Sequence, residues 1–119
     1  MTPDTDGITQ LAMDYFRCLH SGDTGEIKRL FLPECDLLSA NPDGTYTHMS
    51  LEEYVDLVSS RPSPQSQGFE MEGRIRMLDQ TDPNLAVIKV DCAVQPRFFT
   101  DYLSIVKSDG RWRIASKCY

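Results

Sequence analysis

An aspartate at position 101 is the residue whose surroundings most clearly suggest chemistry. We expect a strand over residues 98–107. Alternate side chains of a strand point to opposite faces, which places Asp101 on one face with Phe99 and Leu103. Burial among large apolar side chains disfavours the charged form of a carboxyl group. We therefore expect Asp101 to be protonated and to donate a hydrogen bond to a ligand oxygen; the alternative is an aspartate satisfied by a buried backbone group or by a lysine.

Two further side chains are candidates for the same chemistry. Tyr15 lies on the apolar stripe of a predicted N-terminal helix, where the ring packs and the hydroxyl needs a hydrogen-bond partner. His48 follows a predicted hairpin and is a candidate general base, because histidine titrates at about 6.5. The alternatives are core packing for Tyr15 and a surface position for His48. The candidate catalytic set is therefore Asp101, Tyr15 and His48.

Charge and cysteine usage exclude several classes of protein. The sequence has 18 acidic and 12 basic residues, a net charge of −6, and no basic run that could follow a phosphate backbone, so we expect no nucleic-acid partner. Its cysteines, Cys18, Cys35, Cys92 and Cys118, are dispersed, with no C-x-x-C pair and no paired histidines. We expect no metal site and no cofactor, and we interpret the four thiols as packing residues of a cytoplasmic protein.

The length of 119 residues indicates one domain over residues 1–119. No apolar stretch approaches the roughly 18 residues of a membrane-spanning helix, so we expect no membrane partner. The first four residues, MTPD, lack the basic and apolar regions of a signal peptide.

The elements that must position these residues begin with three helices. Apolar side chains recur at helical spacing near the N-terminus, at Ile8, Leu11, Ala12, Tyr15, Phe16 and Leu19. Gly22 is expected to end this helix, and Asp23 to cap a short second helix that Pro33 ends. Ser50 and Glu53 form a capping box that predicts the start of a third helix.

Strands make up most of the remaining chain. Residues 35–40 and 46–48 are expected to pair as a short hairpin, and residues 59–68 form a long loop. An antiparallel meander of four strands is predicted over residues 69–77, 85–95, 98–107 and 111–118. Strict alternation would direct the basic residues at 74, 76, 89, 111, 113 and 117 outward. The outward face also carries Phe98, Tyr102 and Val106, and we expect it to pair with a second copy as a homodimer.

This order of elements resembles the nuclear-transport-factor-2-like superfamily, which also includes SnoaL-like and ketosteroid-isomerase-like proteins. Within it, three segments resemble the putative lumazine-binding family: SLEEY at 50–54, RPSP at 61–64 and FTDYLS at 99–104. The resemblance implies an α+β, cone-shaped fold, in which three helices pack in the concave face of a strongly bent, mostly antiparallel sheet. A pocket then lies at the open end of the cone.

The resemblance also implies roles for particular residues. Tyr15 and Asp101 fall where ketosteroid isomerases keep an oxyanion-hole tyrosine and a protonated aspartate. Asn41 falls where those enzymes keep their catalytic base, and an amide does not abstract a proton at neutral pH. The residues expected to line the pocket are Tyr15, Phe16, Phe31, Asn41, Tyr54, Phe69, Phe99 and Asp101.

The function predicted from these observations is binding of a small apolar or aromatic molecule in the cone. The alternative is an isomerase, cyclase or dehydratase that acts by acid–base chemistry through Asp101, Tyr15 and His48. A scaffold that only dimerises is a third class, and an occluded cavity would favour it.

Overall fold

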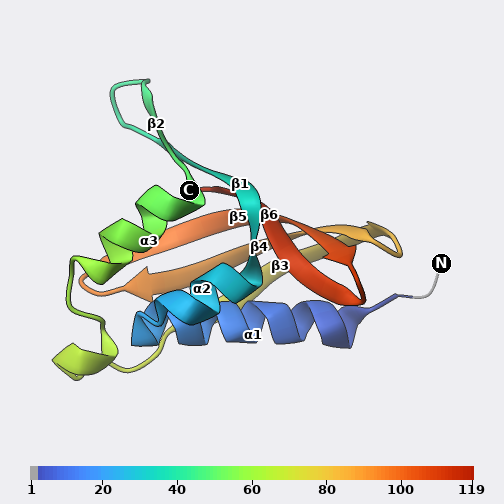
Figure 1. Ribbon diagram of the computed structural model, residues 1–119, viewed down its shortest axis with the longest axis horizontal. Coiled ribbons are helices and arrows are strands. Elements are labelled where there is room, and N and C mark those ends of the chain that lie inside the picture. The colour runs from blue at the N-terminus through green and yellow to red at the C-terminus, as the bar shows by residue number, and fades with distance from the viewer. Residues whose placement is uncertain (1–2) are drawn as a thin grey trace.

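A curved six-stranded sheet, in the order β2-β1-β6-β5-β4-β3, forms one layer of the computed structural model, and three helices pack against one face of it (Figure 1). The helices are α1 (Thr5–Ser21), α2 (Thr24–Leu30) and α3 (Leu51–Ser59), with a short 3₁₀ helix η1 (Gln65–Gln67). The strands are β1 (Phe31–Ala40), β2 (Tyr46–Met49), β3 (Gly73–Asp82), β4 (Leu85–Val94), β5 (Arg97–Ser108) and β6 (Arg111–Cys118). The structure describes residues 3–119; Met1 and Thr2, part of the predicted domain and of the N-terminal segment discussed above, lie outside the described residues.

The α+β class, the helix order and the antiparallel β3–β6 meander are confirmed. The hairpin of β1 and β2 extends the sheet because β1 pairs in parallel with β6. In Figure 1 this hairpin projects away from the body of the molecule. None of the helices among residues 3–119 is long and apolar enough to cross a membrane.

The predicted helix caps are present. Gly22 ends α1 in the left-handed conformation, with φ of 69°. Asp23 caps α2 by accepting a hydrogen bond from the backbone N–H of Glu26 at 3.2 Å. At α3 the Ser50 hydroxyl and the Glu53 carboxylate each accept from the other residue's backbone N–H, both at 3.1 Å. Local sequence therefore fixes where each helix begins.

The prediction that Pro33 ends the second helix is wrong. The helix α2 ends at Leu30, and Pro33 lies inside β1. The pairing of β1 with β6 is irregular between Phe31 and Asp36, so the ladder is interrupted where the proline stands. A proline, which has no N–H to donate, is tolerated in a strand at such an interruption.

The first strand of the meander begins later than predicted. Phe69 and Met71 lie before β3, and both side chains are exposed. The strand starts at Gly73, whose missing side chain leaves room for the ring of Phe16: a Cβ atom at this position would overlap the ring. The alternation of side chains is also broken, since a bulge between Ile75 and Met77 turns Met77 outward.

The core lies between the helices and the concave face of the sheet. Its largest fully buried side chains include Tyr15, Phe16, Phe31, Ile88, Leu103 and Ile105. Tyr15 packs between Phe16 and Phe31, with ring centroids 6.3 and 6.1 Å away. These aromatic rings fill much of the cone, so the space left for a ligand is restricted to one end.

Candidate functional site

A cluster of polar groups surrounds Asp101 in the interior, where this side chain is 1% exposed. The Tyr15 hydroxyl donates a hydrogen bond to Asp101 Oδ2 at 2.6 Å, and the Cys92 thiol donates to the same oxygen at 3.1 Å. The ammonium of Lys117 lies 3.8 Å from it. Asp101 Oδ2 is therefore a hydrogen-bond acceptor, and Asp101 donates to neither of these neighbours. The contacts match the alternative drawn from the sequence, an aspartate paired with a buried lysine.

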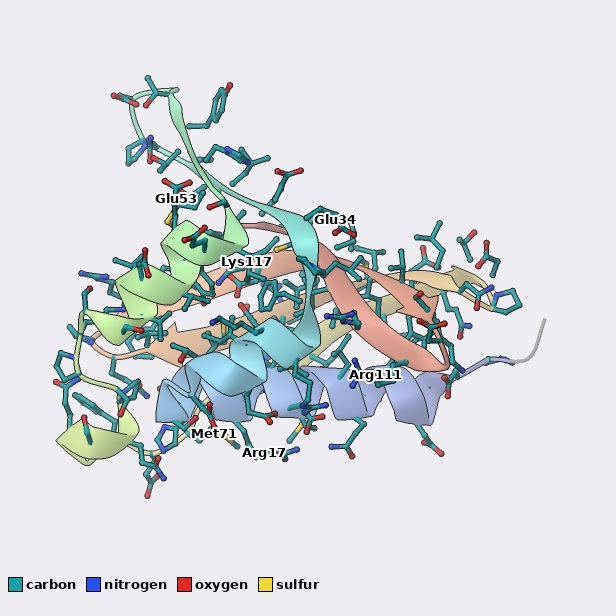
Figure 2. The ribbon with its side chains drawn as sticks, in the orientation of Figure 1. Arg17, Glu34, Glu53, Met71, Arg111 and Lys117 are labelled. Atoms are coloured by element: carbon teal, nitrogen blue, oxygen red, sulfur yellow. The ribbon has the colours of Figure 1, made fainter. Side chains whose placement is uncertain are left out.

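Lys117 reaches the interior because of an irregularity in β6. Ile105 pairs with Ile114 and Ser104 with Ser116, which leaves Ala115 as an extra residue in β6. The extra residue reverses the alternation, so Lys117 shares the inward face instead of pointing outward as predicted. Its side chain lies inside the molecule, whereas the labelled Arg17 lies at the periphery (Figure 2).

Aromatic rings surround the Lys117 ammonium. It lies 4.7 Å from the ring centroids of both Tyr54 and Tyr119, and it donates a hydrogen bond to the Tyr54 hydroxyl at 3.3 Å. Burial lowers the pKa of Lys117, but the neighbouring Tyr54 and Asp101 oppose that effect, and the net pKa lies above the ordinary lysine value. Lys117 is therefore an ammonium at neutral pH, which makes it a hydrogen-bond donor and not a nucleophile.

The other members of the cluster are uncharged at neutral pH. Burial raises the pKa of Tyr15 well above its usual value, and the charge of Asp101 raises it further. Burial also raises the pKa of the Tyr54 hydroxyl and that of the Cys92 thiol. A thiol held in its protonated form does not act as a nucleophile. The cluster can thus hold a polar group or move a proton, but it offers no activated thiol.

A cavity of about 150 Å³ lies beside this cluster, at one end of the cone. We call it the inner cavity. Its lining residues are Leu19, Tyr54, Leu57, Arg61, Val94, Arg97, Phe99, Asp101, Lys117 and Tyr119. Leu57 and Arg97 are exposed, Arg61 is half-buried, and these three form the mouth, whereas Asp101 and Lys117 are buried at the base. Apolar and aromatic walls with a few polar groups at one end are typical of a small-molecule site.

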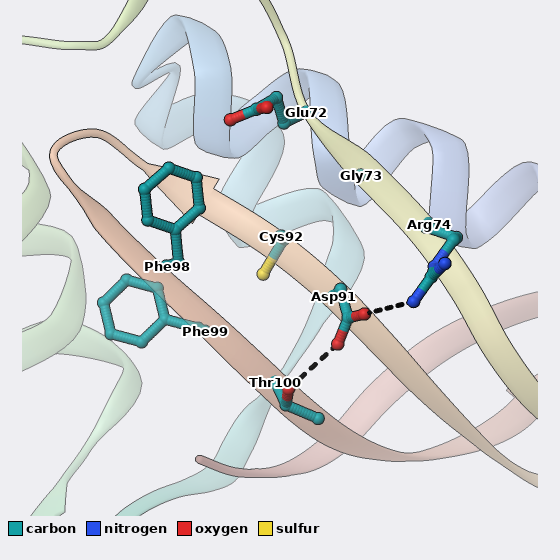
Figure 3. Close-up of a pocket in the computed structure, with 8 residues that line it drawn as sticks. All are labelled: Glu72, Gly73, Arg74, Asp91, Cys92, Phe98, Phe99 and Thr100. Atoms are coloured by element: carbon teal, nitrogen blue, oxygen red, sulfur yellow. Dashed lines mark hydrogen bonds and ion pairs between the residues drawn. The ribbon is translucent and has the colours of Figure 1, made fainter.

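A wider and more open hollow of about 500 Å³ lies across the neighbouring strands β3, β4 and β5 (Figure 3). Its principal polar groups already satisfy one another: Asp91 accepts from Arg74 and from Thr100, both at 2.9 Å. Phe98, on its rim, is 69% exposed. Since this hollow has no buried charge, the inner cavity is the stronger candidate site.

The structure brings some of the predicted site residues together and separates others. Tyr54, Phe99 and Asp101 line the inner cavity, and Tyr15 lies behind it, hydrogen-bonded to Asp101. Phe16 and Phe31 do not line the inner cavity but belong to the core.

Three predicted site residues lie away from the inner cavity. Phe69 precedes β3 and is 41% exposed, so it does not line the cavity. Asn41 lies in the turn of the projecting hairpin, where its amide donates to Thr45 Oγ1 at 3.0 Å, a turn-forming role. His48 lies on β2 with its Nε2 2.8 Å from a carboxylate oxygen of Asp36, and its side chain is 49% exposed. His48 is therefore not placed to act as a base for a ligand beside Asp101.

Four further residues line the inner cavity with polar or charged groups and were not predicted as site residues: Arg61, Arg97, Lys117 and Tyr119. Arg61 belongs to the RPSP segment, one of the three segments that resemble the putative lumazine-binding family. That resemblance was the one sequence feature that could have indicated a role for Arg61. Lys117 was concealed by the irregularity at Ala115. Within residues 3–119, no three His, Cys, Asp or Glu side chains converge in a way that could hold a metal ion.

Comparison with known proteins places the chain in a family. The family model described as putative lumazine-binding matches residues 3–119, and the chain belongs to this family. The aldolase FrzH of a Cladobotryum species is 25% identical over 116 residues, which cover 96% of this chain and 88% of FrzH.

Solved structures share the fold at lower sequence identity. An NTF2-like protein of unknown function from Methylobacillus flagellatus KT has a TM-score of 0.80 and 23% identity, covering 97% of this chain and 89% of its own. A ketosteroid isomerase-like protein from Erwinia carotovora atroseptica SCRI1043 has a TM-score of 0.68 and 16% identity, and the match covers 99% of this chain and 95% of that protein's chain. The chain therefore has the nuclear-transport-factor-2-like cone fold.

Proposed function

We propose that this protein binds a small, partly aromatic molecule in the inner cavity. The observation that carries the proposal is a buried ion pair, Lys117 with Asp101, at the base of a cavity whose mouth is open to solvent. Burying two charges is costly, so the pair at this place is better explained by recognition of a polar group than by stability alone. The family description and the cone fold support the same function.

The walls of the cavity suit a flat ligand. Tyr54, Tyr119 and Phe99 provide aromatic surface, and Phe99 packs edge-on against Tyr119 with ring centroids 5.8 Å apart. The cavity, about 150 Å³, matches the size of an engineered cavity that holds benzene. One ring therefore fits inside, and larger parts of a ligand would extend through the mouth.

Native mass spectrometry of protein purified from its own host tests the proposal. We expect a bound small molecule that is lost on denaturation. The variant Leu57→Trp, which places a bulky side chain at the mouth, should abolish its retention, whereas Met13→Trp, at an equally exposed position on α1, should not. Retention of the same molecule by Leu57→Trp would show that it does not occupy the inner cavity.

A second candidate function is enolate chemistry, and the Asp101–Lys117 pair together with the name of the FrzH relative favours it. Asp101 would take a proton from the carbon next to a substrate carbonyl, and the electron pair of that C–H bond would form an enolate whose oxygen is stabilised by Lys117. The enolate carbon would then form a bond to a second carbonyl carbon, and the new alkoxide would recover the proton from Asp101. Because Lys117 is an ammonium, this route involves no imine.

Hydrogen–deuterium exchange at carbons next to a carbonyl distinguishes the two functions. An enzyme of this kind should catalyse exchange in small ketones, and Asp101→Asn should remove it. Treatment with borohydride should leave Lys117 unmodified, because no imine forms. If the protein retains a bound molecule but catalyses no exchange or condensation, binding is its function.

A further inference from the structure

The inner cavity has a local charge opposite to that of the whole chain. Three cationic side chains, Arg61, Arg97 and Lys117, line it together with one carboxylate, Asp101. Counted over side chains, this is a formal excess of two positive charges in a protein whose net side-chain charge is −6. A cleft lined by one sign of charge between low-dielectric walls concentrates ligands of the opposite sign.

The excess charge belongs to the two arginines at the mouth, because Lys117 is balanced by Asp101. Across the part of the chain that the structure describes, neither Arg61 nor Arg97 forms an ion pair or a side-chain hydrogen bond. Four other arginines form ion pairs, namely Arg17, Arg29, Arg74 and Arg76, whereas within residues 3–119 Arg111 and Arg113 form none. Arg61 and Arg97 come from distant segments, one just after α3 and the other at the start of β5, and the fold brings both to the same cavity.

The chemistry of these groups specifies a ligand. A guanidinium presents a planar set of N–H donors that match a carboxylate, and such charge-assisted hydrogen bonds are stronger than neutral ones. The mouth, with Arg61 and Arg97, is therefore suited to an anionic group. The aromatic walls are suited to one ring, and the Lys117 ammonium at the base is suited to a carbonyl oxygen.

We infer that the ligand of the inner cavity is an anion: a monocyclic aromatic or conjugated carboxylate, with its ring between Tyr54, Tyr119 and Phe99 and its carboxylate at Arg61 and Arg97. This inference rests on the proposed function, since it specifies the class of molecule bound. It excludes neutral aromatic molecules as the preferred ligands.

Paired probes of equal shape test the charge of the ligand. Benzoate and benzamide differ by one charge and little in volume, and titration calorimetry measures both. We expect benzoate to bind at least about tenfold more tightly than benzamide. Raising the salt concentration from about 0.01 M to about 1 M should weaken the binding of benzoate and leave the binding of benzamide nearly unchanged.

Substitutions at the mouth test the residues. Arg61→Gln and Arg97→Gln should each weaken the binding of benzoate several-fold without changing the binding of benzamide. Arg111→Gln is the matched control, since Arg111 is exposed and lies outside the inner cavity. Arg97 is exposed and Arg61 is half-buried, and Trp112 fluorescence checks that both variants fold.

The outcomes separate the inference from the proposed function. Equal binding of benzoate and benzamide would overturn the inference and leave the proposed binding function standing. Equal competition by inorganic phosphate would show a bare anion site without selection of a ring, and would also overturn it. If neither benzoate nor benzamide binds, the inference is also overturned. The proposed binding function is then tested separately, by whether native mass spectrometry detects a retained molecule.

Discussion

The carboxylate of Asp101 and the ammonium of Lys117 lie 3.8 Å apart in the interior. Each of the two groups also forms a hydrogen bond with a tyrosine hydroxyl of a helix. Tyr15 of α1 donates to Asp101, and Lys117 donates to Tyr54 of α3. The pair therefore joins two helices to two neighbouring strands, β5 and β6, at the base of the inner cavity.

Removing one member of this pair should destabilise the fold strongly. Asp101→Asn leaves the buried Lys117 ammonium without its counter-charge, and Lys117→Met leaves the Asp101 carboxylate without its own. Each substitution should lower the free energy of unfolding by about 3–5 kcal/mol. The double variant leaves no unpaired charge, so it should cost clearly less than the sum of the two single changes. Urea unfolding followed by Trp112 fluorescence measures all three. Additive losses would show that the two groups do not interact.

The sequence predicted the helices of this fold well because their signals are local. Gly22, Asp23 and the Ser50–Glu53 box act within a few residues of themselves, and each cap is present. Asp101 was placed correctly on a buried face for the same reason: β5 alternates without interruption from Phe99 to Ile105.

The sequence could not reveal the partner of Asp101, because the alternation of a strand holds only until a bulge occurs. The extra residue Ala115 places Lys117 on the inward face, where the alternation predicted the outward one, and the bulge after Ile75 places Met77 on the outward face. Neither bulge is marked by a glycine or a proline. The position of His48 depends on tertiary structure instead: it lies on β2, in the hairpin that projects away from the body of the molecule (Figure 1).

Replacing Gly73 should destabilise the protein through overpacking. A Cβ atom at this position would overlap the Phe16 ring, which is 1% exposed and has little room to move. We expect Gly73→Ala to cost about 1–3 kcal/mol in chemical unfolding. A smaller side chain in the double variant Phe16→Leu/Gly73→Ala should recover part of that loss relative to the sum of the single changes. A Gly73→Ala variant as stable as the natural protein would show that the strand shifts freely.

The protein should lose stability in alkaline solution. The folded-state pKa values of Tyr15, Tyr54 and Lys117 are raised, so the unfolded chain releases these protons first as the pH rises above about 10. Their contribution is complete below that pH and is lost as the pH rises through the folded-state pKa values. When the melting temperature is measured from about pH 8 to about pH 11, it should decrease in the upper part of this pH range.

Tyrosinate absorbance gives the control for the alkaline experiment. The buried Tyr15 and Tyr54 should ionise only as the protein unfolds, because burial raises the pKa of each hydroxyl. Tyr15→Phe should reduce the alkaline loss, and Tyr46→Phe should leave it unchanged. Ionisation of all the tyrosines in one step ahead of unfolding would contradict the prediction.

The outward face of the meander should mediate a homodimer. On β5 the side chains of Phe98 and Tyr102 are exposed, and Val106 continues their row. Lys89 of β4 lies 5.2 Å from the Tyr102 ring centroid, so apolar and charged groups alternate across this face. A sheet face that is this apolar is typical of one covered by another surface, and a two-fold axis lets two identical faces cover each other.

Sedimentation velocity at micromolar concentration tests this pairing. We expect a dimer for the natural protein and a monomer for Phe98→Asp, because a carboxylate in the interface would be buried without a partner. Tyr46→Asp, at an equally exposed aromatic position on the projecting hairpin, should remain dimeric. A monomeric natural protein would exclude the homodimer. A dimer that Phe98→Asp leaves intact but Tyr46→Asp dissociates would instead place the interface on the β1–β2 hairpin.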